Sequence, residues 1–498
     1  MPTRIRPVFP RFQAALFRAG GIAAFVLILI PSLQAQILTL EKALEIAFKN
    51  SPSIQEARYQ LTINGENLKA QQAGLKSQFL LTLTPLTVSQ TRTFSDLTSR
   101  YNTQELTKSA LRFSITQPIK WTDGTLTIVD SFNWQKAASS YTGFISEATF
   151  NNSLTFRLIQ PVFTYNRTKM QIRQLELSLE NSQINYNLQK LSIERSVTQQ
   201  FLGLYSTLES VKIAQEELKN ATESYQIIES KVKAGISAPE ELYQADLTRL
   251  NSVAGLENKQ MSYENALDNF KILLGVPLTQ EIEVVADIRK QLAEVDLQKA
   301  VDHAQANRME LRTRNNAILT ALDNLIKTDA ENEFKASIDV SLGLTGVNKQ
   351  FQSIYESSNT DKQIAVSLNI PVFDWGQKTH RLAASQAAVD TQRMSFEEYR
   401  KQITLEIRQA YRTLQNQKRQ IEIVEINVQN AQRTYEINLE RYKNGDLSSK
   451  DMQFYQLQLS QQRLNQLQAL INYKLALLDI KIRSLWDFEN NRSVIDNF

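Results

Sequence analysis

Apolar and polar residues follow two different periods along this chain, and the change from one period to the other occurs twice. Segments in which apolar and polar residues alternate are followed by long segments in which apolar residues recur every three or four positions. The first pattern predicts strands and the second predicts helices packed along one face. Both changes fall at nearly identical stretches, QPVFTYN around Pro161 and IPVFDWG around Pro371. Since Gly235 and Gly445 are separated by the same number of residues as these two prolines, we infer an internal repeat.

The alternating segments precede each Pro-Val-Phe stretch. They lie at about 80–160 in the first repeat, where four strands fit, and at about 337–371 in the second, where two fit. Each is about 9 to 11 residues long, the length of a tilted strand that crosses a membrane. A half-buried strand of a soluble sandwich alternates in the same way, but here long helices flank the strands and no companion domain is available to cover them. Pro85 weakens the first strand, because proline donates no hydrogen bond to a sheet.

The helical segments after the strands have a heptad pattern. From Ile407 to Tyr442, spacings of three and four alternate, and the first repeat follows the same pattern. Such a pattern, sustained over this length, predicts left-handed supercoiling against neighbouring helices. The two predicted long helices, 166–234 and 376–444, would each be about 100 Å long, which is far more than a globular domain needs.

Each long helix is predicted to end at a glycine. Gly235 and Gly445 each follow basic residues, a combination that suits the left-handed end of a helix and the negative end of its dipole. Ser237 and Ser448 are candidate N-caps of the helices that return from these turns. The return helices are predicted at 237–274 and 448–485.

The N-terminus has the features of a secretory signal peptide. Four arginines precede or open an apolar run at 19–30, and Ala35 provides a small residue for cleavage. The run of about 12 residues is shorter than the ~20 needed to span a bilayer, although a membrane anchor is the alternative. Export would place the mature chain in the periplasm, the outer membrane or the exterior. The predicted organisation is a signal peptide 1–35, a first structural repeat 36–278, a linker 279–294, a second structural repeat 295–486 and a C-terminal tail 487–498.

The composition argues against several kinds of site. The chain has no cysteine, which excludes disulfides, thiolate metal sites and cysteine nucleophiles. His303 and His380 have no partners at ligand spacing, so neither a metal site nor a cofactor is expected. The net charge of +4 is small and evenly spread, which argues against nucleic acid as a partner. No motif supports a catalytic constellation, so we expect no catalytic residue and no enzyme.

Taken together, these features resemble the TolC-like outer membrane efflux proteins. The resemblance rests on LEKALEIA followed by NSP, on the paired Pro-Val-Phe stretches, on the paired basic turns that end in glycine, and on LLGVP at the end of the first repeat. It covers nearly all of the chain after the signal peptide. It implies an α+β fold in which a trimeric outer-membrane β-barrel is continuous with a long periplasmic α-helical coiled-coil barrel, with two structural repeats per protomer.

The strand count departs from that family. The family pattern has four strands per protomer, whereas this sequence has two further alternating segments in the first repeat, one of them near 125–134. The extra pair could widen the barrel to 18 strands or form a separate hairpin, and the sequence does not decide between the two.

The resemblance also implies a function. The protein would be the outer membrane channel of a tripartite efflux or type I secretion system, passively conducting substrates across the periplasm and the outer membrane. Its partners would be two further copies of itself, a periplasmic adaptor protein docked at the turns with Gly235 and Gly445, an inner-membrane transporter, and outer membrane lipid. The cargo depends on transporter and adaptor, which lie outside this chain. The alternative is a non-conducting periplasmic or surface coiled-coil structural protein or adhesin.

The resemblance places a gate at the periplasmic tip. Glu241 and Asp451 match positions that are acidic in the family and constrict the closed channel. Phe454 stands where the family has a second constricting acid, and Leu447 stands where it has a basic residue that holds the closed state. The closed gate is therefore either acidic or apolar. Acidic residues in the first turn of a helix also stabilise that helix through its dipole, which is the simpler interpretation of Glu241 and Asp451.

Four residues are predicted to mark the seam between barrel and helices. Proline fits neither a strand ladder nor a helix interior, so it suits the boundary between the two. The aromatic residues beside it suit the membrane surface. The predicted seam residues are Pro161, Phe163, Pro371 and Phe373.

Overall fold

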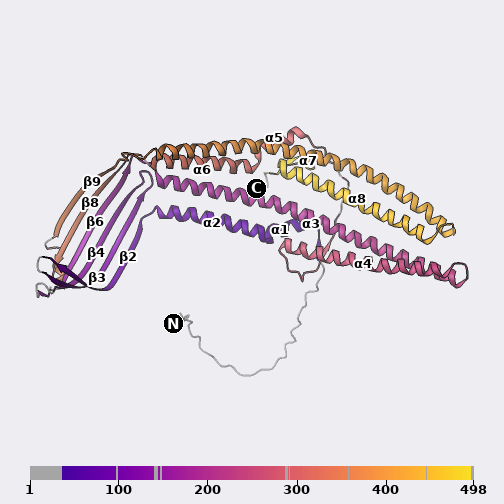
Figure 1. Cartoon of the computed structure of the whole chain (residues 1–498), viewed down its shortest axis with the longest axis horizontal. Helices are drawn as coiled ribbons and strands as arrows, with labels where there is room; N and C mark the ends of the chain where they lie inside the picture. Colours follow the sequence, from indigo (N-terminus) through magenta and orange to yellow (C-terminus); the bar gives the residue numbers. More distant parts are fainter. Residues whose placement is uncertain are drawn as a thin grey trace, which may run out of the picture.

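The computed structural model describes residues 36–96, 99–139, 144–145, 148–286, 290, 292–331, 333–356, 358–444 and 446–494. The predicted signal peptide, 1–35, and Gly445 lie outside these residues. The molecule is elongated, with a sheet at one end and helical hairpins at the other (Figure 1).

Among the described residues, six long antiparallel strands form the sheet, in the order β2-β3-β4-β6-β8-β9. Their bounds are β2 Gln78–Ser95, β3 Arg100–Ile119, β4 Gly124–Ser139, β6 Thr149–Val162, β8 Lys335–Asn348 and β9 Ser358–Asn369. A short strand, β5 (Phe144–Ile145), pairs with the end of β4. The first repeat supplies four of the long strands and the second supplies two. The two further segments predicted in the first repeat, which correspond to β2 and β4, therefore lie in the same sheet as the others.

Pro85 lies in β2, where the strand is irregular. The register of β2 against β3 shifts between Thr84 and Thr87, and Ser109 Oγ donates a hydrogen bond of 2.6 Å to the carbonyl oxygen of Pro85. A bulge of this kind leaves a residue unpaired, so the missing donor of proline costs no ladder hydrogen bond. The strand continues on both sides of it.

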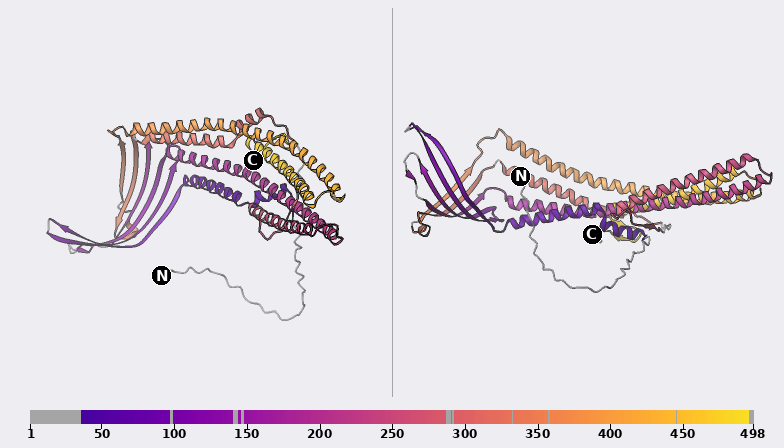
Figure 2. Two further views of the ribbon diagram at one scale, coloured as in Figure 1. Left: turned by 45° about the vertical axis from the view of Figure 1, so that its right-hand side comes forward. Right: turned by 90° about the horizontal axis from the view of Figure 1, so that it is seen from below.

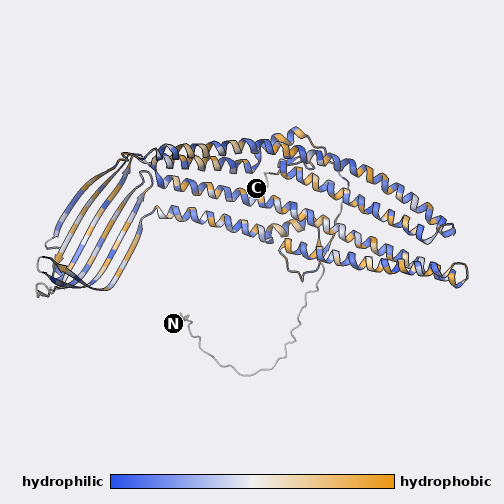
Figure 3. Ribbon diagram, viewed as in Figure 1, coloured by the Kyte–Doolittle hydropathy of each residue, from blue (hydrophilic) through white to orange (hydrophobic). Residues whose placement is uncertain are grey.

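The sheet has one apolar face and one polar face. Directly paired residues lie on the same face, because side chains alternate along each strand. One row on the apolar face contains Phe79, Ile115, Ile128, Phe156 and Leu342. One row on the polar face contains Gln78, Thr116, Thr127, Arg157, Ser341 and Gln363. Figure 3 shows the resulting alternation along the strands.

The apolar face is largely uncovered in the single chain. Leu342 and Leu344 keep 40% and 39% of their surface exposed. Polar residues also lie on this face. Asn152 Nδ2 donates to Asp130 Oδ1 over 2.8 Å, and Lys362 and Thr360 of β9 lie opposite Leu342 and Leu344. At the end of the sheet away from the helices, the connection from β8 to β9 contains the short 3-10 helix η1 (Phe351–Ser353), whose Phe351 ring contacts that of Phe132 at 5.4 Å. An extended apolar face of this kind suits contact with lipid.

Long helices continue from the strands. Asn166 caps α3 and accepts a hydrogen bond from Lys169 N, and Asp296 and Thr39 cap α5 and α1 in the same way. The helices that reach the sheet are α2 (Pro52–Gly74), α3 (Arg167–Lys233), α6 (Met309–Glu331) and α7 (Gln377–Asn444). The return helices are α4 (Pro239–Leu274) and α8 (Ser449–Ser484), and the short opening helices are α1 (Leu40–Asn50) and α5 (Leu297–Asn307).

The main apolar core lies midway along the molecule. There Phe201 of α3 and Phe270 of α4 are almost fully buried, with ring centroids 6.1 Å apart. Leu38 and Val284 join this core because β1 (Gln36–Leu38) pairs in parallel with β7 (Ile282–Val284). The segment predicted only as a linker, 279–294, therefore contains a strand. Three residues are too short a pattern to predict a strand from sequence.

The described part of the C-terminal tail, which ends at Val494, is folded against the helices, and residues 495–498 of the predicted tail lie outside the described residues. β10 (Trp486–Asp487) pairs with β11 (Arg492–Ser493), and Val494 is buried beside Leu485 and Leu191. Lys481 lies 3.5 Å from Asp487 and 3.0 Å from Glu194. The tail thus fixes the end of α8 to α3.

Candidate gate and docking site

Two antiparallel helical hairpins, α3–α4 and α7–α8, form the end of the molecule farthest from the sheet (Figures 1 and 2). In the first turn, the backbone N–H groups of Gly235 and Ile236 donate to the carbonyls of Val232 and Lys231 over 3.0 and 2.9 Å. Gly235 has a φ of +74°, and no atom lies within 4 Å of where its Cβ would be. Backbone conformation rather than space therefore calls for glycine here.

The two return helices begin differently. Ser237 does not cap α4, because α4 begins at Pro239 with Ala238 as its N-cap and no side-chain cap. Proline at the first helical position has no N–H to satisfy, so the helix starts there. Ser448 does cap α8, as predicted, and accepts a hydrogen bond of 3.1 Å from Asp451 N. The predicted docking residue of the second turn, Gly445, lies outside the described residues.

The three predicted gate residues all lie in the first turns of the return helices. Glu241 is exposed in the first turn of α4. The carboxylate of Asp451 accepts a hydrogen bond of 2.7 Å from Ser448 Oγ, and so holds the hydroxyl that caps α8 by accepting from Asp451 N. One helical turn farther, Phe454 is 62% exposed, and its ring makes an edge contact with Tyr455 at 5.5 Å. Asp451 thus has a local structural partner, whereas Phe454 presents most of its ring to solvent in the single chain.

A polar cluster joins the two hairpins close to the tip. Ser224 Oγ of α3 lies 3.0 Å from Tyr442 Oη of α7 and 3.1 Å from Ser449 Oγ of α8. Thr248 Oγ1 of α4 donates to Gln453 Oε1 of α8 over 3.3 Å. These contacts line a groove of about 400 Å³ between the hairpins. The heptad pattern identified Tyr442 only as a packing position, because a heptad does not reveal a hydroxyl partner in another hairpin.

The predicted seam residues lie where strands give way to helices. Pro161 is the penultimate residue of β6, opposite β8, and Pro371 follows the end of β9. Phe163 has a φ of +58° and is exposed. Phe373 is exposed and makes an edge contact with Trp375 at 4.7 Å. Their role at a membrane boundary stays a prediction.

The turn between β3 and β4 is fixed to the start of α3 by Asp123. Its Oδ2 accepts from Arg167 Nε over 2.9 Å, and its Oδ1 accepts from Thr168 N over 3.1 Å. Burial acts to raise the pKa of Asp123, but the hydrogen bonds from Thr168 and Arg167 lower it below its usual value. The sequence signal was only a turn, Thr-Asp-Gly, and it did not reveal this contact.

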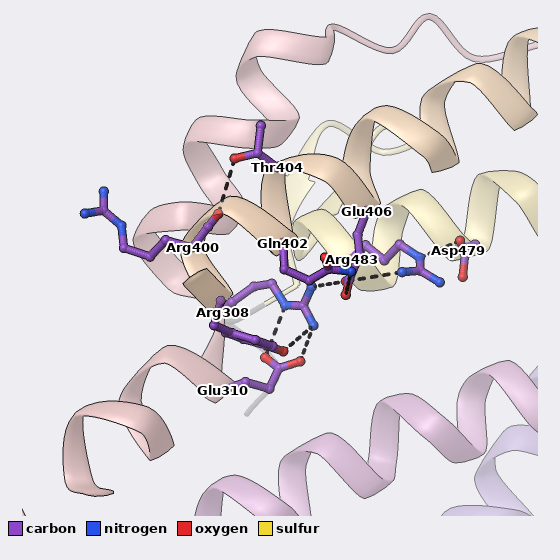
Figure 4. A network of polar contacts seen from close by, with 9 residues as sticks. Arg308, Glu310, Arg400, Gln402, Thr404, Glu406, Asp479 and Arg483 are labelled. Atoms are coloured by element: carbon purple, nitrogen blue, oxygen red, sulfur yellow. Dashed lines mark hydrogen bonds and ion pairs between the residues drawn. The ribbon is translucent and has the colours of Figure 1, made fainter. Parts of the chain in front are cut away.

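A partly buried ionic network joins both repeats midway along the helices (Figure 4). Glu406 of α7 accepts from Arg308 Nη1 over 2.8 Å and from Arg483 Nη1 of α8 over 3.2 Å. Asp479 of α8 accepts from Arg483 Nε over 2.6 Å and lies 3.2 Å from Arg195 of α3. Burial alone would lower the pKa of Arg308, yet its hydrogen bonds to carboxylates keep that pKa above its usual value. None of these residues belongs to a recognisable motif.

Two kinds of feature are not found in the described part of the chain. No group of three or more His, Cys, Asp or Glu side chains there has the arrangement of a metal site. Among the helices that the structure describes, none is both long enough and apolar enough to cross a membrane.

Residues 125–276 and 332–481 match the outer membrane efflux protein family. These segments make up more than half of the chain, so the protein belongs to that family, and the predicted resemblance is confirmed. A comparison with curated proteins found no match.

Several solved outer membrane channels share the fold. The Campylobacter jejuni CmeC outer membrane channel is 16% identical, with a TM-score of 0.67, over 92% of this chain and 88% of that one. The Vibrio cholerae outer membrane protein VceC is 14% identical, with a TM-score of 0.64, over 89% of this chain and 95% of that one. The Neisseria gonorrhoeae MtrE outer membrane channel, solved in its open state, is 14% identical, with a TM-score of 0.64, over 89% of this chain and 88% of that one.

The predicted fold class is confirmed: a trimeric outer-membrane β-barrel continuous with a long periplasmic α-helical coiled-coil barrel, with two structural repeats per protomer. The protein is an efflux channel of the outer membrane that extends into the periplasm. Nothing in the comparisons supports the alternative of a coiled-coil scaffold or adhesin.

Proposed function

We propose that the protein is a passive exit duct that is closed at its periplasmic tip and opened by partner proteins. The observation that carries this proposal is a sheet with an uncovered apolar face and two unpaired edges, β2 and β9, continuous with helical hairpins. An unpaired edge is not tolerated in lipid, so copies of the chain must pair β9 of one with β2 of the next. Because β2 runs away from the helices and β9 runs back towards them, this pairing is antiparallel.

The partners follow from the position of the tip. A duct without a catalytic or nucleotide-binding constellation supplies no energy, so an inner-membrane transporter supplies it, and we assign this chain no enzymatic activity. A periplasmic adaptor protein docks on the hairpin turns, where Gly235 lies beside Ile236, whose side chain is 74% exposed. The adaptor opens the tip only if it binds the open arrangement more tightly than the closed one.

The gate in this proposal is a ring of Phe454 side chains, one from each protomer. An exposed aromatic ring one helical turn beyond Asp451 favours an apolar barrier, since a narrow apolar constriction closes a pore by excluding water. Glu241 and Asp451 add negative charge beside it. The contacts of Ser224 with Tyr442 and Ser449 hold the two hairpins of one protomer together in the closed state.

Release of a small dye from liposomes tests the proposal. Purified protein is reconstituted as wild type, as Phe454→Ala, and as Ile426→Ala, a control that removes an exposed apolar side chain from α7 away from the tip. We expect slow release from wild type and the control, and at least tenfold faster release from Phe454→Ala. Equal release from all three would contradict a gate at Phe454, and no release from any of them would contradict a duct.

A further inference from the structure

The hairpin of β3 and β4 is held in the sheet on both sides. β3 pairs with β4 from Gln104–Ile119 to Gly124–Ser139 without a shift in register. Beyond the hairpin, β3 pairs with β2, and β4 pairs with β6. A hairpin that folded away from the barrel would have at most one neighbouring strand outside itself.

The faces of the hairpin match those of the other strands. Phe113 and Ile128 project to the apolar face, whereas Ser114 and Thr127 project to the polar face. A half-buried strand of a soluble protein alternates in the same way, but the apolar face of this hairpin is uncovered, and Phe113 keeps 39% of its surface exposed. An uncovered apolar face opposite a polar one suits a strand that meets lipid on one side and water on the other. The hairpin therefore has the surface of a membrane-spanning pair.

The turn of the hairpin is anchored at the helical end of the sheet. Besides the contacts of Asp123 with Arg167 and Thr168, Asn166 Nδ2 donates to the carbonyl oxygen of Lys120 over 2.8 Å. From β6, Gln160 Nε2 donates to the carbonyl oxygen of Thr122 over 2.8 Å. The turn is thus fixed both to the N-terminus of α3 and to the next strand.

We propose that each protomer contributes six strands to the barrel, so that the trimer closes an 18-stranded barrel that admits bulky hydrated solutes. This inference rests on the trimeric duct proposed above. At the usual strand spacing and a tilt of about 40°, 18 strands close at a backbone diameter of about 35 Å, against about 24 Å for 12 strands. Side chains on both walls leave an opening of roughly 20 to 25 Å, as in barrels that enclose an aqueous channel.

The polar face indicates how such a barrel treats its cargo. Its side chains are mainly hydroxyls and amides, among them Thr127, Ser131 and Ser341. Arg157 projects to this face beside Asp339, with Nε 3.0 Å from Oδ1, so the two charges offset each other. Arg112 and Lys108 of β3 and Asp361 of β9 also lie on this face, so the lining carries charges of both signs. The barrel is then too wide to select by small size, and that selection falls to the tip.

Engineered disulfides test the strand count, since the chain has no cysteine of its own. The β9 set combines Leu81→Cys on β2 with Ile364→Cys, Val366→Cys or Leu368→Cys on β9 of the neighbouring chain. The β6 set combines Leu81→Cys with Leu154→Cys, Phe156→Cys or Leu158→Cys on β6, the strand that would lie beside β2 if the hairpin of β3 and β4 stood outside the barrel. The control pair is Leu154→Cys with Leu344→Cys, which are directly opposed on β6 and β8 within one chain. Three β9 positions are used because the register between protomers is set only on closure.

We expect oxidation to link subunits in the β9 set and to form no disulfide in the β6 set. Disulfides in the β6 set, or in neither set while the control pair forms, would overturn six strands per protomer. An amine-reactive cross-linker is applied to every sample; absence of a trimer there would overturn the proposed duct instead. As a second readout, neutral polymers of about 8 Å radius, added from the extracellular side, should enter the barrel and lower its conductance, whereas the opening of a 12-stranded barrel would exclude them. Their exclusion would contradict the width.

Discussion

At the scale of single residues, Asp451 combines two roles, and a substitution by alanine would remove both at once. Its carboxylate accepts a hydrogen bond from Ser448 and so takes part in capping α8, and it is also a charge at the proposed constriction. We expect Asp451→Asn to raise the closed-state conductance or to weaken block by cations, because the amide keeps an acceptor for Ser448 and lacks the charge. Single-channel recording in planar bilayers measures this effect.

The matched control for Asp451 is Ser448→Ala. It removes the cap and should cost about 1 kcal/mol of stability while leaving cation block unchanged. If both variants change the current equally, Asp451 acts only as a helix cap.

Asp123 gives the seam a dependence on pH. Its pKa in the folded protein lies below the unfolded value of about 3.9, so the stabilisation is present above about pH 4 and is lost as the pH falls through the folded pKa. Asp123→Ala should cost about 1 to 2 kcal/mol at neutral pH, because the partly buried Thr168 and the exposed Arg167 lose a charged acceptor. Asp123→Asn, which tolerates the φ of +59°, should cost less.

Thermal unfolding in detergent measures both Asp123 variants against pH. The difference in melting temperature between wild type and Asp123→Asn should shrink below about pH 4. A constant difference from pH 7 to pH 3 would contradict a role for the ionised carboxylate.

At the scale of elements, long regular patterns were predictable and contacts between distant segments were not. The heptad spacing placed the helices now seen as α3 and α7, and alternation placed strands on both sides of the linker. The pairing of β1 with β7 was missed, because each strand has three residues and their pairing spans more than 200 positions. The contacts of Asp123 and Ser224 were missed for a similar reason, since each depends on side chains in different elements.

The ionic network around Glu406 is the element-level contact with the largest expected effect on stability. Glu406→Ala leaves Arg308 and Arg483 without their shared carboxylate. The side chain of Arg308 is only 10% exposed. Removing one partner of a buried ion pair costs about 3 to 5 kcal/mol. We expect a clear fall in the melting temperature, measured by circular dichroism in detergent.

Glu397→Ala is the control for Glu406. Glu397 lies on the same helix and also faces an arginine, Arg400, at 3.6 Å, but both side chains are exposed. An exposed pair contributes about 0 to 1 kcal/mol, so its loss should change the melting temperature little. Similar falls in melting temperature for Glu406→Ala and Glu397→Ala would show that burial of the network does not contribute to stability.

At the scale of the whole molecule, the two repeats explain both the shape and the need for partners. Each repeat contributes strands, a long helix and a return helix, but a single chain leaves an apolar sheet face and two strand edges uncovered. Closure by further copies covers the edges, and lipid covers the face. The repeat made this architecture predictable from sequence. The number of strands in the sheet could be assigned only from the strand pairing in the structure.

Single-channel recording of the purified trimer in a planar bilayer tests the central claim most directly. With no transporter, adaptor or energy source present, a passive duct closed at its tip should insert as discrete units of small, ohmic conductance. The Phe454→Ala variant should raise the conductance of each unit severalfold without changing the trimer. A protein that inserts as a trimer and shows no conductance steps in either form would contradict the account.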